Sequence, residues 1–259
     1  MLFSITLSLL SLVTAGYSQT LYLAGDSTMA LGGGGSGTQG WGVPLSQYLS
    51  IPIVNDAVGG ESARSYSDQG KFTRLINVAK KGDFVIVEFG HNDVSAGAVD
   101  NGKQDAVGDG YNITSIVTTA DGTQILVHSF AYYIENAVAS LLAKGAIPII
   151  SSLTPDNIWT NGAIAAGGRF VTYAKSIGTR RNVTYVDHYA YTAQAYNKLG
   201  QTQVNTFYPN DHLHTNAAGA NIVAQAFLGK QSQMGASEEN VLVNSSIPHA
   251  APSCGHDTE

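Results

Sequence analysis

Five short apolar runs, with helical patterns between them, constrain the fold of this chain most strongly. The runs are nearly continuous in apolar and β-branched residues instead of alternating with polar ones, which is typical of parallel strands covered on both faces. They are Leu21–Ala24, Ile51–Asn55, Phe84–Phe89, Ile147–Leu153 and Val183–Asp187. Because helical segments separate them, the sequence predicts a three-layer, doubly wound α/β domain with a five-stranded parallel sheet.

Amphipathic patterns predict the helices. The clearest is Phe130–Lys144, where an apolar stripe ends before Gly145, a residue suited to cap a helix C-terminus. A closing helix is expected over Asn216–Leu228, with Thr215 as its N-cap. Shorter helices are expected over Trp41–Tyr48, Phe72–Ala79, Phe170–Ile177 and Tyr189–Leu199.

Two stretches lack a clear period. Val94–Thr123 is rich in Gly, Asp, Asn and Thr, and long loops of this kind in compact domains are usually functional or mobile. Gln231–Glu259 is a polar segment that we expect to be a partly disordered tail. We see no linker that would divide the chain between them, so the sequence predicts one domain over residues 19–230.

The N-terminus suggests secretion. Residues 1–18 contain an apolar run followed by small residues, as in a signal peptide, although no Lys or Arg precedes the run. The run is shorter than the roughly 20 apolar residues of a membrane-spanning helix. Three glycosylation sequons begin at Asn112, Asn182 and Asn244 and fit the same route. Cys254 is the single cysteine, so no intrachain disulfide can form, and we take this thiol to be incidental.

Charge excludes one class of partner. The formal net charge is −6, charged residues make up 12% of the chain, and the 13 Lys and Arg residues are scattered. Nucleic-acid binding depends on clustered basic residues, so we expect no nucleic-acid partner. No segment after the N-terminal run is apolar enough to cross a membrane, and a monomer handling neutral polar material is expected.

Chemically capable residues follow several of the predicted strands. Gly25-Asp26-Ser27 follows the first, Asn55–Ser62 the second and Gly90-His91-Asn92-Asp93 the third, while Asp211-His212-Leu213-His214 precedes the closing helix. In open parallel sheets, ligands bind beyond the carboxyl ends of the strands. The four segments are therefore predicted to meet at one edge of the sheet.

These segments contain the parts of a serine nucleophile. Ser27 needs a base to take its proton, His214 is suited to that role, and Asp211 can orient the imidazole from three residues away. The backbone N–H groups of Ser27 and Gly60 and the side-chain amide of Asn92 could bind an oxyanion. Taken singly, each of these residues is also common in turns and helix caps.

In this order, Gly25-Asp26-Ser27, Gly60, Gly90-His91-Asn92-Asp93 and Asp211-x-x-His214 resemble the four sequence blocks of the SGNH (GDSL-type) hydrolases. Within that family, the segments around Gly40-Trp41-Gly42 and Ala57–Ser65 are most similar to the rhamnogalacturonan acetylesterases. The resemblance covers about residues 20–230. It implies a flavodoxin-like fold, a triad of Ser27, Asp211 and His214, and an oxyanion hole of Ser27, Gly60 and Asn92.

The resemblance also implies a substrate and a place of action. It implies a secreted, cofactor-free esterase that removes acetyl groups from a plant cell-wall polysaccharide. The expected polysaccharide is rhamnogalacturonan. One alternative is an esterase that acts on another acetylated polysaccharide or on a small ester. The other is a non-catalytic carbohydrate-binding relative. Arg64 and Arg74 are candidate contacts for uronate carboxylates. Two departures are Glu61, where an Arg is common after Gly60, and the absence of the cysteines that form disulfides in fungal relatives.

Three competing patterns are weaker. Gly32-x-Gly34-x-x-Gly37 formally fits a dinucleotide fingerprint, but it lies beyond the strand and opens no helix. His188, His212 and His214 have no helical spacing or further ligand set to support a metal site. Asp26 and Asp93 could form a glycosidase pair, but both lie inside the serine blocks, which favours a structural role.

Overall fold

A computed structural model describes residues 19–95 and 99–229 of the chain. The predicted signal peptide, the predicted tail, Asn244 and Cys254 lie outside the described residues. No helix in the described part of the chain is long and apolar enough to span a membrane.

The five predicted strands form one parallel sheet in the order β2-β1-β3-β8-β11. Their bounds are β1 (Leu21–Gly25), β2 (Ile53–Asn55), β3 (Phe84–Glu88), β8 (Ile147–Ser151) and β11 (Thr184–Val186). Counted along the chain, this is the 2-1-3-4-5 order of doubly wound, flavodoxin-like sheets. The predicted fold class is therefore confirmed.

Alternation along each strand divides the core into two layers. Leu21 and Leu23 belong to one apolar cluster, whereas Tyr22 and Ala24 belong to the other, because successive side chains of a strand point to opposite faces. Both faces are covered by helices, so every residue of β1 is buried. This double burial explains why the strands read as continuous apolar runs.

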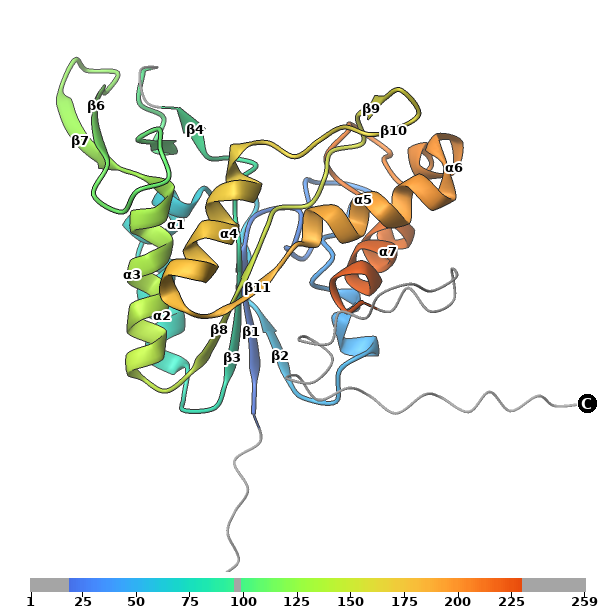
Figure 1. Ribbon diagram of the computed structural model, residues 1–259, viewed down its shortest axis with the longest axis horizontal. Coiled ribbons are helices and arrows are strands. Elements are labelled where there is room, and N and C mark those ends of the chain that lie inside the picture. The colour runs from blue at the N-terminus through green and yellow to red at the C-terminus, as the bar shows by residue number, and fades with distance from the viewer. Residues whose placement is uncertain (1–18, 96–98, 230–259) are drawn as a thin grey trace, which may run out of the picture.

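The helices form two outer layers (Figure 1). Helices on one face pack over Tyr22 and Ala24; they are α1 (Ala63–Asp68), α2 (Lys71–Val78), α3 (Phe130–Ala143) and α4 (Arg169–Arg181). The other face is covered by η1 (Pro44–Gln47), α5 (His188–Leu199), α6 (Gln201–Asn205) and α7 (Ala217–Phe227).

Two predictions about helix ends have different outcomes. Gly145 follows the end of α3 with φ of +75°, a left-handed conformation that favours glycine, as expected. The N-cap of α7 is Asn216, whose side chain accepts the N–H of Gly219, and not Thr215. Thr215 instead donates its hydroxyl to the carbonyl of Gln39.

The stretch predicted as an irregular loop, Val94–Thr123, contains regular structure. Its strands are β4 (Val94–Ser95), β5 (Gln104–Asp105) and β6 (Thr114–Thr118), which pairs antiparallel with β7 (Gln124–His128). In β6 and β7 a single residue each, Val117 and Val127, is buried. With only one buried residue in each of these two strands, their sequences show almost no alternation of apolar and polar residues. A second small hairpin joins β9 (Trp159–Thr160) to β10 (Ala163–Ile164).

Candidate active site

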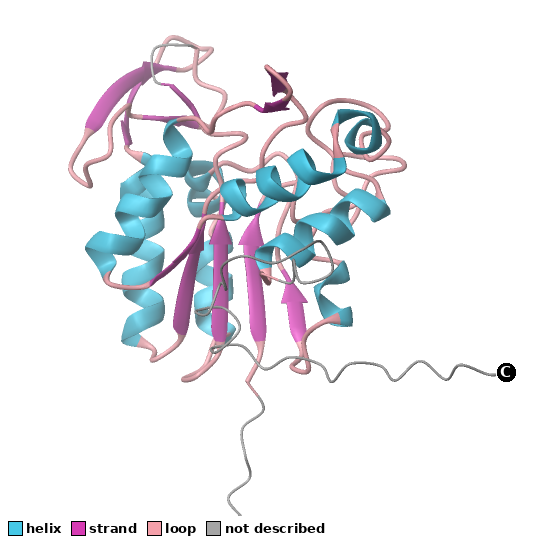
Figure 2. Cartoon of the chain, turned by 45° about the vertical axis from the view of Figure 1, so that its right-hand side comes forward, coloured by secondary structure: helices cyan, strands magenta, loops and turns pink. Residues whose placement is uncertain are grey.

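The turn after β1 presents Ser27 at the carboxyl edge of the sheet, where the strand arrowheads and many of the loops gather (Figure 2). Gly25 ends the strand, and a Cβ on this residue would lie 3.0 Å from the carbonyl oxygen of Glu88, so larger residues do not fit. Asp26 closes the turn, since its Oδ1 accepts the N–H of Thr28 at 2.9 Å and the hydroxyl of Thr28 at 2.8 Å. Burial raises the pKa of Asp26.

Three side chains form a continuous series of hydrogen bonds. The Ser27 hydroxyl oxygen lies 2.8 Å from Nε2 of His214, and Nδ1 of His214 lies 2.7 Å from Oδ2 of Asp211. Ser27 is 5% exposed. His214 lies in the loop that precedes α7. The structure thus brings together the three residues that the sequence proposed as a triad.

Asp211 selects the tautomer of His214. Burial opposes ionisation of this carboxyl, but hydrogen bonds from the His214 ring and from two backbone N–H groups outweigh it and lower its pKa. Those N–H groups belong to Leu213 and His214 and donate to Oδ1 at 2.8 and 2.7 Å. An ionised carboxylate can only accept, so Nδ1 carries the ring hydrogen and Nε2 presents a lone pair to Ser27.

Ser27 itself, Gly60 and Asn92 carry the candidate donors for a negative oxygen. Gly60 has φ of +80°, and a Cβ on the preceding Gly59 would lie 3.6 Å from Cβ of Ser27. Neither Ser27 nor Gly60 donates its backbone N–H to an acceptor among the described residues. Asn92 donates one amide hydrogen to the carbonyl of Glu61 at 3.1 Å, which leaves its second hydrogen available.

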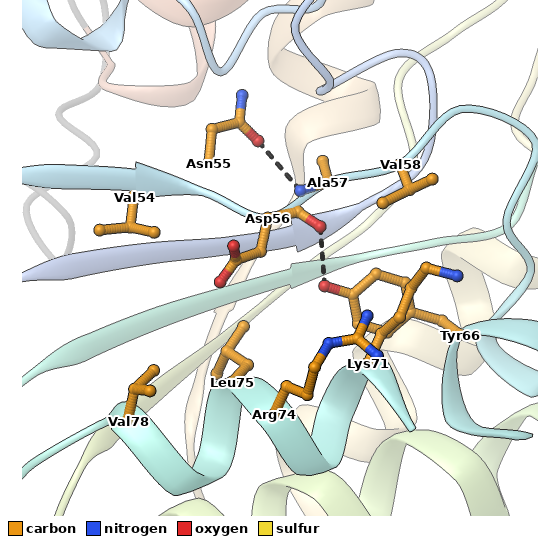
Figure 3. Close-up of a pocket in the computed structure, with 10 residues that line it drawn as sticks. All are labelled: Val54, Asn55, Asp56, Ala57, Val58, Tyr66, Lys71, Arg74, Leu75 and Val78. Atoms are coloured by element: carbon orange, nitrogen blue, oxygen red, sulfur yellow. Dashed lines mark hydrogen bonds between the residues drawn. The ribbon is translucent and has the colours of Figure 1, made fainter. Parts of the chain in front are cut away.

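The segment that leads from β2 to Gly60 is fixed by side chains on both sides (Figure 3). Oδ1 of Asn55 accepts the N–H of Ala57 at 3.1 Å, and the hydroxyl of Tyr66 donates to the carbonyl of Asp56 at 2.9 Å. A pocket of about 510 Å³ lies between this segment and α2, with Arg74 on its wall. These contacts hold the approach to Gly60 in one conformation.

The glycine-rich loop after β1 touches the imidazole. A Cβ on Gly34 would lie 2.4 Å from Cγ of His214, so the bare backbone of Gly34 packs against the ring. Residues Gly32, Gly33, Gly35 and Gly37 of the same loop have positive φ. The sequence pattern that formally fits a dinucleotide fingerprint therefore builds one wall of the site. Sequence reasoning found the glycines but not this contact.

Two buried carboxyl groups connect the site to the following loop. Asp93 accepts the N–H of Ala63 at 2.9 Å, at the start of α1, and both Asp93 and Asp105 of β5 are buried. Burial raises the pKa of both groups, and the negative charge of Asp93 raises that of Asp105 further. The raised pKa of Asp105 favours its protonated form at neutral pH. Asp93 thus has the structural position expected for it.

Two other histidines are hydrogen-bonded to residues outside the triad. His188 is fully buried; its Nε2 donates to the carbonyl of Val223, and Nδ1 lies 2.8 Å from Glu88. Glu88 also accepts the indole N–H of Trp41 at 2.8 Å and the hydroxyl of Ser151 at 2.5 Å. Glu88 therefore has three buried partners, Trp41, Ser151 and His188.

His91, for its part, lies 3.3 Å from the hydroxyl of Thr154. Within the described residues, no three His, Cys, Asp or Glu side chains are grouped so that they could hold a metal ion.

Arg64 does not face the open site. Its side chain is 7% exposed and pairs with Asp100 at 2.8 Å and with Asp68 at 3.2 Å. It also donates to the carbonyl of Gln104. The suggestion that Arg64 meets a substrate carboxylate is therefore wrong: this guanidinium holds the loop around Asp100 against α1.

A doubly wound parallel sheet with this set of side chains at its carboxyl edge defines an α/β protein equipped for ester hydrolysis. The chain belongs to the GDSL-like lipase/acylhydrolase family, whose model matches residues 21–227. It is a carboxylic ester hydrolase, and the resemblance seen in the sequence is confirmed.

Individual relatives agree with this assignment. A rhamnogalacturonan acetylesterase of Emericella nidulans is 48% identical over 226 residues, which cover 87% of this chain and 89% of that protein. A probable rhamnogalacturonan acetylesterase of Bacillus subtilis, YesY, is 26% identical over 215 residues, covering 79% and 88%. The solved structure of protein YxiM from Bacillus subtilis matches with a TM-score of 0.66 at 20% identity, over 85% of this chain and 58% of that one. The last likeness shows a common fold.

Proposed function

We propose that this chain is a secreted serine esterase that removes acetyl groups from a plant cell-wall polysaccharide, with rhamnogalacturonan as the substrate. The main support is the hydrogen-bonded series from Ser27 through His214 to Asp211, with distances of 2.8 and 2.7 Å. The substrate assignment is supported by the 48% identical relative, which carries the name rhamnogalacturonan acetylesterase. The proposed enzyme acts as a monomer without a cofactor.

In the first half of the reaction, Ser27 attacks the acetyl carbonyl carbon while Nε2 of His214 takes the hydroxyl proton. The carbonyl oxygen becomes negative and receives hydrogen bonds from the N–H groups of Ser27 and Gly60 and from the amide of Asn92. Asp211 stabilises the imidazolium. His214 then returns the proton to the sugar oxygen as the C–O bond breaks, which leaves an acetyl group on Ser27.

In the second half, water attacks the acetylated Ser27, and His214 takes a proton from that water. The same donors hold the negative oxygen of the second tetrahedral intermediate. Collapse breaks the bond to the Ser27 oxygen, which recovers its proton from His214, and acetic acid leaves and ionises to acetate in solution. The reaction consumes one water molecule and involves no change of oxidation state.

Pockets on both sides of β1 support a polymeric substrate. One, of about 260 Å³, is lined by residues of the segment after β2, including Gly60, and by Lys103. The other, of about 290 Å³, is lined by residues that follow β3 and β8, among them His91 and Thr154, and by Tyr189 of α5. In the strand order, β1 lies between β2 on one side and β3 and β8 on the other, so neighbouring sugars of one chain could occupy the two pockets on either side of the turn that carries Ser27.

Acetate release from a panel of acetylated polysaccharides tests the proposal. Acetylated rhamnogalacturonan should be the best substrate, ahead of acetylated xylan, and the small ester p-nitrophenyl acetate should also be cleaved. Ser27→Ala should lower kcat by about 10⁶-fold at an unchanged melting temperature. A protein that binds the polysaccharide but cleaves no ester would instead be a carbohydrate-binding relative.

Secretion and glycosylation belong to the same proposal. Asn112 and Asn182 are both exposed, so an oligosaccharide could be attached at either sequon without disturbing the core. Expression in a eukaryotic host should place the enzyme in the medium, with a mass that decreases on treatment with an N-glycosidase. Retention inside the cell would contradict this part of the proposal.

A further inference from the structure

Lys103 lies next to the proposed oxyanion hole. Its ammonium nitrogen lies 3.7 Å from the position that a Cβ on Gly60 would take, and a Cβ on Gly59 would lie 3.6 Å from Cβ of Ser27. Lys103 and Gly60 both line the pocket of about 260 Å³, together with Asn101, Gly102 and residues of α1. A positive charge therefore borders the path by which a substrate reaches Ser27.

The ammonium of Lys103 has no partner among the described residues, whereas the carboxylates around it are already paired. Glu61 binds Lys71 at 2.7 Å. Asp68 and Asp100 both bind Arg64, at 3.2 and 2.8 Å. A partly exposed cation that has no partner in the described part of the chain can accept an external anion without breaking an ion pair seen there.

The loop that carries Lys103 is held in a defined conformation. The backbone N–H of Lys103 donates to Oδ1 of Asn101 at 3.0 Å. The side chain of Gln104, a residue that is 1% exposed, accepts the N–H of Asn101 at 3.0 Å. Gly102 has φ of +80° and donates to Asp100, which Arg64 binds from α1. This scaffold fixes the backbone of Lys103 relative to Gly60, so little ordering is required when a ligand arrives.

We infer that Lys103 determines substrate specificity by binding the carboxylate of a uronate sugar next to the acetylated sugar. The inference rests on the proposed function, because it concerns the substrate of that same site. A carboxylate in this pocket would receive one charge-assisted hydrogen bond from the ammonium. The acetyl group of the neighbouring sugar would then lie toward Ser27. Asp68, on the same pocket wall, would repel a carboxylate, which favours binding on the side of Lys103.

The test compares two kinds of substrate in the wild type and in Lys103→Met. Loss of the ammonium should raise KM for an acetylated, uronate-containing oligosaccharide about tenfold, the size of one hydrogen bond to a charged group. Its kcat should be nearly unchanged, as should kcat/KM for p-nitrophenyl acetate and for acetylated xylo-oligosaccharides without glucuronate side groups, both of which offer no uronate. Lys103→Arg should retain most of the wild-type KM, and added salt should reduce the difference between Lys103→Met and the wild type.

A matched control is Lys175→Met, which removes an exposed lysine of α4 away from the site and should leave both substrates unaffected. Equal losses on p-nitrophenyl acetate and on the uronate substrate would overturn the inference, since the ammonium would then act on the reaction itself. An unchanged KM for the uronate substrate would overturn it as well. If the wild type cleaves none of these esters, the proposed function itself fails. If the wild type cleaves them with the same KM whether or not they contain a uronate, only the inference about Lys103 fails.

Discussion

Gly34 should control the position of the His214 imidazole, the proposed catalytic base. In Gly34→Ala the new Cβ would lie 2.4 Å from Cγ of His214, whereas nonbonded carbon atoms settle at about 3.5 Å or more. The deficit is about 1 Å. The ring cannot rotate freely to avoid it, because Asp211 holds Nδ1 at 2.7 Å. We therefore expect the ring to shift relative to Ser27.

The expected loss follows from that shift. The hydrogen bond from Ser27 to His214 is 2.8 Å long, and a movement of about 1 Å takes it beyond hydrogen-bonding distance. Misplacement of this size costs about 100-fold in rate, which corresponds to ~2.7 kcal/mol of activation free energy. KM should change little, because Gly34 leaves the donors beside Ser27 in place.

Initial rates with p-nitrophenyl acetate measure the loss of activity in Gly34→Ala, and a thermal unfolding curve measures its stability. The melting temperature should stay within a few degrees of the wild type. Gly37→Ala is the matched control: Gly37 lies in the same loop with φ of +76°, and no atom lies within 4 Å of its added Cβ. It strains the loop without touching His214. Full activity in Gly34→Ala, or an equal loss in Gly37→Ala, would refute the reasoning.

Substitutions at three other residues test the site and its support. Asn92→Ala removes one oxyanion donor and should lower kcat by about 10²–10³-fold with KM nearly constant; a change confined to KM would contradict that role. Glu88→Ala leaves the Trp41 indole and His188 without their buried partner, and chemical denaturation should show a loss of about 3–5 kcal/mol, whereas Glu88→Gln, which can still accept and donate, should lose much less. The raised pKa of Asp105 means that the folded state keeps a proton which the unfolded chain releases above about pH 4. The contribution of this carboxyl to stability is therefore complete below that pH and declines as pH rises toward the raised value. Asp105→Asn carries permanent amide hydrogens and should remove this decline, so wild-type and variant stabilities should differ in slope between about pH 6 and 9; parallel curves would argue against a protonated Asp105.

The parts of the structure that the sequence predicts well are those with a strong local signature. All five strands of the sheet were identified, and the signature is strongest in β1 and β3, where burial on both faces makes the strand a continuous apolar run. Ser27, Asp211 and His214 follow from the rule that reactive side chains gather at the carboxyl edge, combined with the pairing that serine chemistry needs. Their hydrogen-bonded geometry agrees with that prediction, while their roles await the kinetic tests.

The parts that the sequence misses depend on contacts between distant segments. Gly34 has no side chain, so nothing in its own sequence reveals that a histidine ring lies against its backbone. Arg64 reads as a free surface cation until Asp68 and Asp100 are seen beside it. Lys103 stands out only after those pairs are known, because its feature is that residues 19–95 and 99–229 supply no partner for its ammonium.

The bond between Ser27 and His214 joins residues separated by 187 positions. Ser27 follows the first strand and His214 precedes the last helix, so a ribosome must release almost the whole domain before the two can meet. Shorter nascent chains therefore carry no working nucleophile. Recovery of esterase turnover after dilution from denaturant should accordingly report the final docking of the C-terminal part onto the sheet, later than the recovery of helical circular dichroism.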